Sequence, residues 1–294
     1  MTAAIRALLT DVIDYAGLFP PAALSLDDSI QNYAKYLGSD YRWMLGKFIC
    51  PAAKLAQLQP YVNELFSTGE PLRISALGRG GNTDVEFNAA VEADFHDMAR
   101  FVEAARGRAT VDAYEAKLPA LGATTLPGAS RDIYLEPAAG ADWLQSMKFI
   151  ASMRSIGLKL RTGGVEASAF PTVDQVALTI GRCARREDKR MKFTAGLHHP
   201  IRHFNESVNT KMHGFINVFV AGVLAHALQL DEAALVQILS DEDPASFRFS
   251  DDGLRYKAFA ATIDQIKSAR QRVISFGSCS FDEPREDLRA LGWL

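Results

Sequence analysis

Short apolar runs alternate with longer amphipathic segments along most of the chain, and this alternation limits the possible folds more than any other feature of the sequence. The short runs are typical of β-strands and the longer segments of helices. We predict strands at residues 12–15, 43–50, 72–77, 111–117, 133–136, 157–161 and 192–197, and a weaker one at 247–249. We expect helices at residues 25–36, 52–66, 84–105, 141–154, 172–185, 213–228 and 256–274.

Strands that alternate with helices imply parallel βαβ units, which build either an open doubly wound sheet or a closed barrel. A dinucleotide-binding open sheet carries Gly-x-Gly-x-x-Gly in its first turn, whereas the nearest run here, Gly-Arg-Gly-Gly at residues 78–81, has a different spacing. We therefore predict one α/β domain over residues 1–294, a (β/α)8 TIM-type barrel with an additional helical segment towards the C-terminus.

Composition narrows the functional classes. The chain has 294 residues, of which 48% are hydrophobic and 23% charged, and these values exclude a disordered or low-complexity protein. Its 32 Lys and Arg residues against 35 Asp and Glu residues give no basic footprint for nucleic acid. The most apolar stretch, 214–228, is too short to span a bilayer and is expected to be a buried helix. Three cysteines argue against a disulfide framework. We expect a cytoplasmic protein without membrane or nucleic-acid partners, and a homo-oligomer is possible.

Charged residues recur at alternate positions of several predicted strands. Alternate residues of a strand face opposite sides, and barrel enzymes carry their active groups near the C-terminal ends of the strands. In residues 157–161, Leu158 and Leu160 face the helices, so Lys159 and Arg161 are expected on the inner face. The same argument predicts five further inward charges: Lys47, Glu115, Lys117, Glu136 and Lys192.

Buried charges are costly unless they are paired or used. One interpretation is a structural layer of ion pairs, in which Glu115 and Glu136 neutralise Lys117 and Lys159. The predicted inward set, however, holds five cations and two acids. An excess of positive charge is typical of a site that binds a phosphate or a carboxylate.

A lysine that is desolvated beside other cations has a lowered pKa, and its neutral amine can attack a carbonyl to form a Schiff base. Lys159 is the best candidate, because Arg161 shares its face and Lys192 lies on the next predicted strand.

Two segments around these lysines resemble the deoxyribose-phosphate aldolase type of class I aldolase. Residues 159–165, Lys-Leu-Arg-Thr-Gly-Gly-Val, resemble that family's Lys-x-x-Thr-Gly segment, whose lysine forms the Schiff base. Residues 192–198, Lys-Phe-Thr-Ala-Gly-Leu-His, resemble its second-lysine strand, Lys-x-x-Gly-Gly. Arg161 replaces a small hydroxyl residue of the family, and Ala195 replaces a glycine. The resemblance implies that Lys159 is the nucleophile and that Lys192 lowers its pKa.

The same resemblance leaves proton transfer to Glu115 or Glu136, because the aspartate that the family uses has no clear counterpart in this sequence. The other candidate residues bind the anion. Thr162, Gly163 and Gly164 form a turn whose N–H groups are a plausible cradle for it. The remaining predicted substrate-binding residues are Lys47, Lys117, Arg161, His198 and Arg202.

Four histidines, His198, His199, His203 and His213, lie close together in the sequence. Their spacing matches no recognised metal-ligand pattern, so we predict neither a metal nor a cofactor, although a metal near the first three remains open. General acid–base work by His198, or anion binding by His198 and Arg202, is the favoured interpretation.

The leading hypothesis is an aldolase-type lyase that acts on a small anionic carbonyl compound through a lysine Schiff base. One alternative is a barrel enzyme that binds an anionic substrate without covalent catalysis, either phosphoribosyltransferase-like or a metal-dependent lyase or isomerase. Another is a barrel that binds a ligand or acts as a scaffold without catalysis.

Overall fold

The computed structural model describes residues 1–119, 126, 132–137 and 142–294. Eight strands close into a barrel in the order β1-β13-β7-β6-β5-β4-β3-β2, which confirms the predicted (β/α)8 TIM-type fold. The barrel strands are β1 (Ile13–Tyr15), β2 (Leu45–Pro51), β3 (Leu72–Leu77), β4 (Ala109–Lys117), β5 (Asp132–Glu136), β6 (Ile156–Arg161), β7 (Met191–Thr194) and β13 (Val273–Ser278).

The chain divides into two compact units. The first, here the N-terminal unit, is Asp14–Lys159, and the second, the C-terminal unit, consists of Met1–Ile13 and Leu160–Leu294. The expectation of a single domain stays a prediction.

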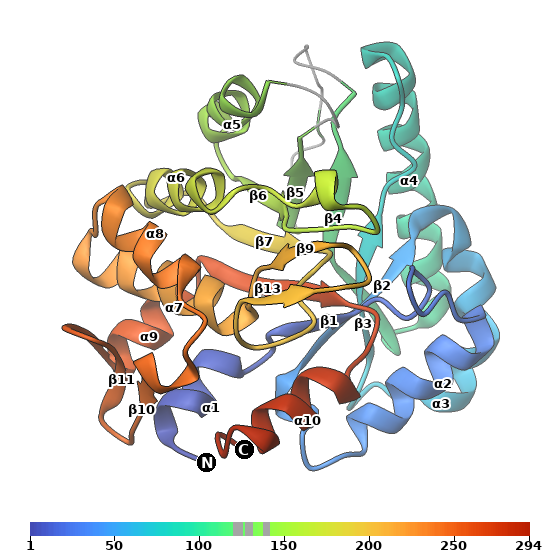
Figure 1. Ribbon diagram of the computed structural model, residues 1–294. Coiled ribbons are helices and arrows are strands. Elements are labelled where there is room, and N and C mark those ends of the chain that lie inside the picture. Colours follow the sequence, from blue (N-terminus) through green and yellow to red (C-terminus); the bar gives the residue numbers. More distant parts are fainter. Residues whose placement is uncertain (120–125, 127–131, 138–141) are drawn as a thin grey trace. The chain divides into compact units, whose positions relative to one another are not determined.

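In the N-terminal unit, β2 to β5 and the start of β6 pair in parallel in chain order. The helices are α2 (Leu26–Leu37), α3 (Gln59–Leu65), α4 (Asp84–Ala105) and α5 (Trp143–Ser152), and a 3-10 helix, η2 (Ala52–Leu58), precedes α3. Ser25 caps α2, as the sequence predicts, because its side chain accepts the Asp28 N–H. The long helix α4 packs against β4, η2 and α3 (Figure 1). The predicted helix at 141–154 is α5, and residue 141 lies outside the described residues.

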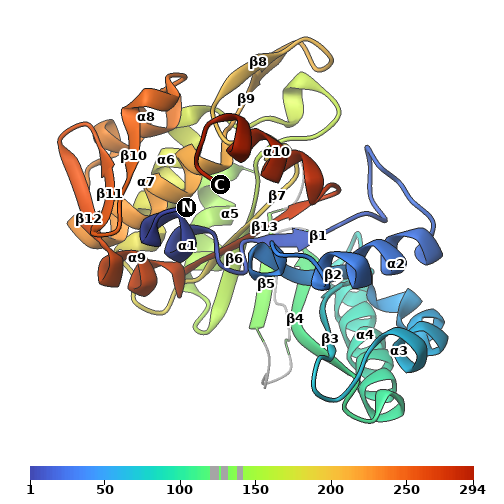
Figure 2. The ribbon, with the colours of Figure 1, turned by 90° about the horizontal axis from the view of Figure 1, so that it is seen from below.

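The C-terminal unit contains α1 (Ala3–Leu9), α6 (Val173–Ala184), α7 (Phe215–Leu228), α8 (Glu232–Ser240), α9 (Ile263–Arg270) and α10 (Asp282–Ala290). Helix α7 is buried from Phe215 to Ala225, as its apolar sequence predicts, and it packs against α6, α8 and α9 (Figure 2). None of the described helices combines the length and the apolar character needed to cross a membrane.

The last part of the predicted strand and helix order is wrong. Residues 247–249 form β10 (Phe247–Phe249), which pairs with β11 (Gly253–Tyr256) and β12 (Phe259–Thr262) in a separate antiparallel sheet. Of the helix predicted at 256–274, only α9 (Ile263–Arg270) is helical, because β12 precedes it and β13 follows it. The eighth barrel strand is β13. A tight connection between β11 and β12, with Lys257 in the left-handed conformation (φ 48°), sets the true boundary. The predicted C-terminal helical segment exists as α10.

Candidate active site

The N-terminal unit buries a lysine between two carboxylates. Glu115 on β4, Glu136 on β5 and Lys159 on β6 expose 0%, 4% and 5% of their surface. Lys159 Nζ lies 2.9 Å from Glu115 Oε2 and 3.3 Å from Glu136 Oε2. Three adjacent parallel strands thus bring together three of the seven residues that the alternation of charges singles out. One ammonium shared by two carboxylates is an arrangement in which a proton can move over short distances.

Ser75 on β3 completes this cluster, and sequence reasoning missed it. Its side chain is fully buried, and its hydroxyl donates a hydrogen bond to Glu115 Oε1. The bond occupies one carboxylate oxygen of Glu115, while the other oxygen faces Lys159. The available signal was one hydroxyl residue in the apolar run at 72–77, which is weaker than a charge.

Two of the predicted inward cations are not enclosed. Lys117 and Arg161, each the last residue of its strand, are exposed. Lys47 is half-buried, and its backbone N–H donates to the buried carboxylate of Asp14 at 2.5 Å. The predicted inward position is therefore wrong for Lys117 and Arg161, and the buried cluster of the N-terminal unit holds one lysine and two glutamates. The substrate-binding roles of Lys47, Lys117 and Arg161 stay predictions.

Lys192 belongs to the C-terminal unit. It lies on β7, and only 1% of its surface is exposed, so the alternation of residues predicted its burial correctly. Its predicted effect on the pKa of Lys159 stays a prediction.

Residues 162–164, the predicted anion cradle, connect the loops that follow β6 and β7. The Thr162 N–H donates to Thr194 O at 2.9 Å, and its hydroxyl donates to Ala195 O at 2.5 Å. A Cβ on Gly163 or Gly196 would lie only 2.8 Å from the Cα of the other glycine. The loops that follow β6 and β7 are thus packed backbone against backbone, and both Thr162 donors are used within the protein. Anion binding by Gly163 and Gly164 stays a prediction.

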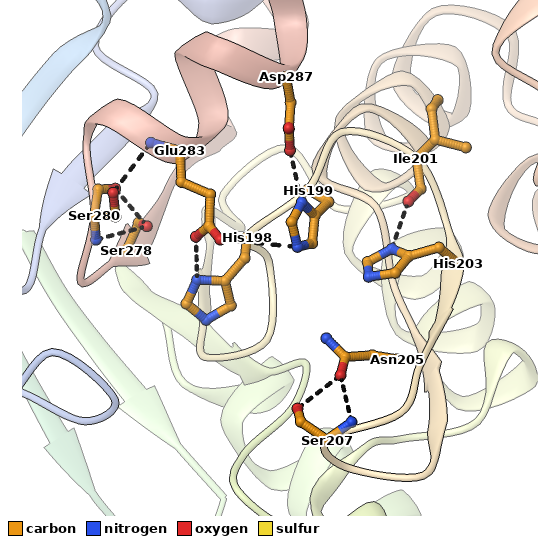
Figure 3. Close-up of polar contacts among 10 residues, drawn as sticks. All are labelled: His198, His199, Ile201, His203, Asn205, Ser207, Ser278, Ser280, Glu283 and Asp287. Atoms are coloured by element: carbon orange, nitrogen blue, oxygen red, sulfur yellow. Dashed lines mark hydrogen bonds and ion pairs between the residues drawn. The ribbon is translucent and has the colours of Figure 1, made fainter.

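Three histidines follow β7; His198 and His199 contact carboxylates of the C-terminal helix, and His203 Nδ1 contacts the Ile201 carbonyl oxygen (Figure 3). His198 Nδ1 lies 3.2 Å from Glu283 Oε2, and His199 Nδ1 lies 2.6 Å from Asp287 Oδ2. The His203 ring packs edge-on against His199, with 4.6 Å between the ring centroids. Because β7 and β13 are parallel neighbours, the segments after their C-terminal ends meet at the same edge.

Glu283 and Asp287 of α10 orient His198 and His199. The hydrogen bond from His198 lowers the pKa of Glu283 despite its partial burial. An ionised Glu283 accepts from Nδ1 of His198, so Nε2 is the nitrogen left for substrate or proton transfer. Sequence reasoning named the histidines but missed Glu283 and Asp287, which are four residues apart on one helix face.

Arg202 and His213 form a second contact after β7. His213 is buried, and burial lowers its pKa to about 4, so the ring is neutral at pH 7. Its Nε2 donates to Pro171 O at 2.8 Å, and its Nδ1 accepts from Arg202 Nη1 at 3.2 Å. Burial also lowers the pKa of the half-buried Arg202 guanidinium. No carboxylate in the described part of the chain lies within ion-pair distance of Arg202, although the charge of Glu242 acts on its guanidinium.

Among residues 1–119, 126, 132–137 and 142–294, no three His, Cys, Asp or Glu side chains are grouped so that they could hold a metal ion. The Nδ1 atoms of His198, His199 and His203 contact Glu283, Asp287 and the Ile201 carbonyl oxygen, respectively. Comparisons of the chain with protein-family models, with curated proteins and with solved structures found no match.

Proposed function

We propose that this chain is an aldolase-type lyase that acts on a small anionic carbonyl compound through an imine with Lys159. The observation that carries the proposal is the buried cluster in which the Lys159 ammonium lies against Glu115 and Glu136. A TIM-type barrel provides the framework, because the active groups of such enzymes come from the C-terminal ends of strands. The resemblance of residues 159–165 and 192–198 to deoxyribose-phosphate aldolase supports the same chemistry.

In this mechanism Lys159 first gives one proton to Glu115, and the neutral amine attacks the substrate carbonyl carbon. Attack places a positive charge on the nitrogen and a negative charge on the substrate oxygen. Glu115 returns its proton to that oxygen, and Glu136 takes one proton from the nitrogen, which gives a neutral carbinolamine. Glu136 then protonates the hydroxyl group, and water leaves as the nitrogen lone pair forms the iminium. The resulting iminium draws the electron pair of the neighbouring carbon–carbon bond towards nitrogen. That bond then breaks, and a carboxylate accepts the proton of the leaving hydroxyl group. Protonation of the enamine carbon and attack by water release the second product and restore the amine.

The residues proposed to bind the anionic group of the substrate are those that the sequence predicts. Arg202 is the strongest candidate, because its guanidinium is half-buried and donates to a neutral imidazole. His198 is held by Glu283 and can offer Nε2 to an oxygen of the substrate. Arg161 and Lys192 keep the roles that the sequence predicts, anion binding and lowering of the Lys159 pKa.

The test is reductive trapping with sodium borohydride in the presence of pyruvate, acetaldehyde, dihydroxyacetone phosphate or glyceraldehyde 3-phosphate. We expect one of these compounds to add its reduced mass to the wild-type protein. Lys159→Met should give no adduct, whereas Lys148→Met, which changes an exposed lysine of α5, should behave as wild type. Absence of an adduct across a broad panel of anionic aldehydes and ketones, with protein shown to be folded, would refute the proposal.

Lys192→Met and Arg202→Gln test the supporting roles. We expect Lys192→Met to slow trapping at saturating substrate, and Arg202→Gln to raise the substrate concentration needed for half-maximal trapping. Unchanged trapping in both variants would leave Lys159 as the nucleophile but contradict the roles assigned to Lys192 and Arg202.

A further inference from the structure

A hollow beside the antiparallel sheet of β10, β11 and β12 is not used by the proposed chemistry. This sheet is part of the C-terminal unit, is separate from the barrel strands and lies beside α1 and α9 (Figure 2). The hollow has a volume of about 520 Å³. The residues on which the argument depends are Arg248, Asp252, Gly253, Arg255, Ala260 and Thr262.

Two arginines face each other in this hollow. Arg248 on β10 is the direct cross-strand partner of Arg255 on β11, and both side chains are exposed. Their neighbours along the strands, Phe247, Leu254 and Tyr256, are buried, so the two arginines share the solvent face of the sheet. Like charges placed directly opposite each other on an antiparallel pair are unfavourable.

Neither arginine is neutralised within the described part of the chain. The guanidinium groups of Arg248 and Arg255 form no hydrogen bond or ion pair with any described residue. Other arginines do find carboxylates, as the exposed Arg42 does with Glu70 and the half-buried Arg73 does with Asp112. Asp252 is the acidic residue of the lining, so two positive charges and one negative charge leave the hollow with a net positive charge.

Small residues beside the arginines leave room for a ligand. Ala260 on β12 is the cross-strand partner of Arg255, and Gly253 is the partner of Thr262. Thr262 Oγ1 accepts the Gln265 N–H, which leaves its own hydroxyl proton to donate. Two guanidinium groups and a hydroxyl donor around an open space suit the several oxygens and the double charge of a phosphate group.

We propose that this hollow binds a small phosphorylated molecule, whose phosphate oxygens bridge Arg248 and Arg255. The inference does not depend on the aldolase proposal, because it uses neither Lys159 nor its carboxylates.

Titration calorimetry with inorganic pyrophosphate at constant ionic strength tests this site. We expect wild-type protein to bind pyrophosphate, and Arg248→Gln and Arg255→Gln each to weaken binding about tenfold or more, as expected for loss of charge-assisted hydrogen bonds. The double variant should show no binding. Arg100→Gln removes an exposed arginine of α4 and serves as the matched control, with unchanged affinity.

Thermal unfolding gives a second measurement. Pyrophosphate should raise the Tm of wild-type protein and of Arg100→Gln but not that of the double variant, because only a bound ligand stabilises the folded state. Without ligand, the double variant should be at least as stable as wild type, since the repulsion between the arginines is gone. Equal pyrophosphate affinity in wild type and double variant would overturn the proposal. So would binding to phosphatidic acid vesicles without binding to pyrophosphate, because the site would then recognise a lipid surface.

Discussion

Replacing Lys159 by methionine removes the one buried cation of the Glu115–Glu136 cluster and keeps most of the apolar stem. In the wild-type protein the ammonium lies 2.9 Å and 3.3 Å from the two carboxylates, and the three side chains are at most 6% exposed. Removing one partner of a buried ion pair typically destabilises a protein by about 3–5 kcal/mol. We therefore expect Lys159→Met to lower the free energy of unfolding by about 3–5 kcal/mol at pH 7.

The cost of protonating a glutamate gives a second estimate of this loss of unfolding free energy, and the two estimates agree. A buried carboxylate without its cation can become neutral, and a glutamic acid of ordinary pKa, about 4.3, takes up a proton at pH 7 at a cost of about 3.7 kcal/mol. At pH 5 the same uptake costs only about 1 kcal/mol. The deficit of Lys159→Met should accordingly shrink when the pH falls from 7 to 5.

Urea denaturation of wild type, Lys159→Met and the double variant Lys159→Met/Glu115→Gln at both pH values measures this effect. We expect the double variant to recover part of the loss, because it carries one negative charge fewer in the cluster. A loss below about 1 kcal/mol at pH 7, the range of exposed ion pairs, would refute the reasoning from burial.

Two further predictions concern the loops after β6 and β7. Because the folded state lowers the pKa of His213 from 6.5 to about 4, its contribution is intact above pH 6.5 and is lost as the pH falls towards 4. Between pH 7 and pH 4.5 this loss amounts to about 2 kcal/mol. Urea denaturation at both pH values should therefore show a fall in stability that is about 2 kcal/mol smaller for His213→Gln than for wild type, and equal falls would contradict the prediction. Gly196→Ala should destabilise the protein by about 1–3 kcal/mol more than Gly292→Ala. Both glycines have φ near +70°, but only Gly196 has a close neighbour, Gly163. Equal Tm values for the two variants would contradict the close approach.

The sequence predicts the barrel well because parallel strands leave a local signal. Residues 72–77 and 133–136 are short apolar runs between helical segments, and the observed strands match them within one residue. The prediction is wrong for residues 253–278, because the strands β11, β12 and β13 are also short and leave no distinct signal. A helix was predicted across 256–274, since its apolar residues fit a helical period as well as two strands and a helix. The strand that completes the barrel, β13, is determined by its pairing with β1 and β7, which lie far from it in the sequence.

In the candidate site too, local patterns predicted some features correctly, and contacts between distant segments were missed. Alternation along strands predicted the burial of Glu115, Glu136, Lys159 and Lys192, because a strand fixes the side of each residue. It did not predict whether a charged residue at the end of a strand is exposed, as Arg161 is, or buried, as Glu136 is. Partners that come from distant segments, such as Glu283 beside His198, depend on tertiary structure that no local pattern contains.

The position of the trapped adduct tests the central claim most directly. After borohydride reduction with the compound that gives the strongest adduct, the protein is digested and its lysine-containing peptides are sequenced by mass spectrometry. The account predicts the added mass on Lys159, at a stoichiometry approaching one per chain. An adduct on Lys192 or Lys47 with Lys159 unmodified would contradict it.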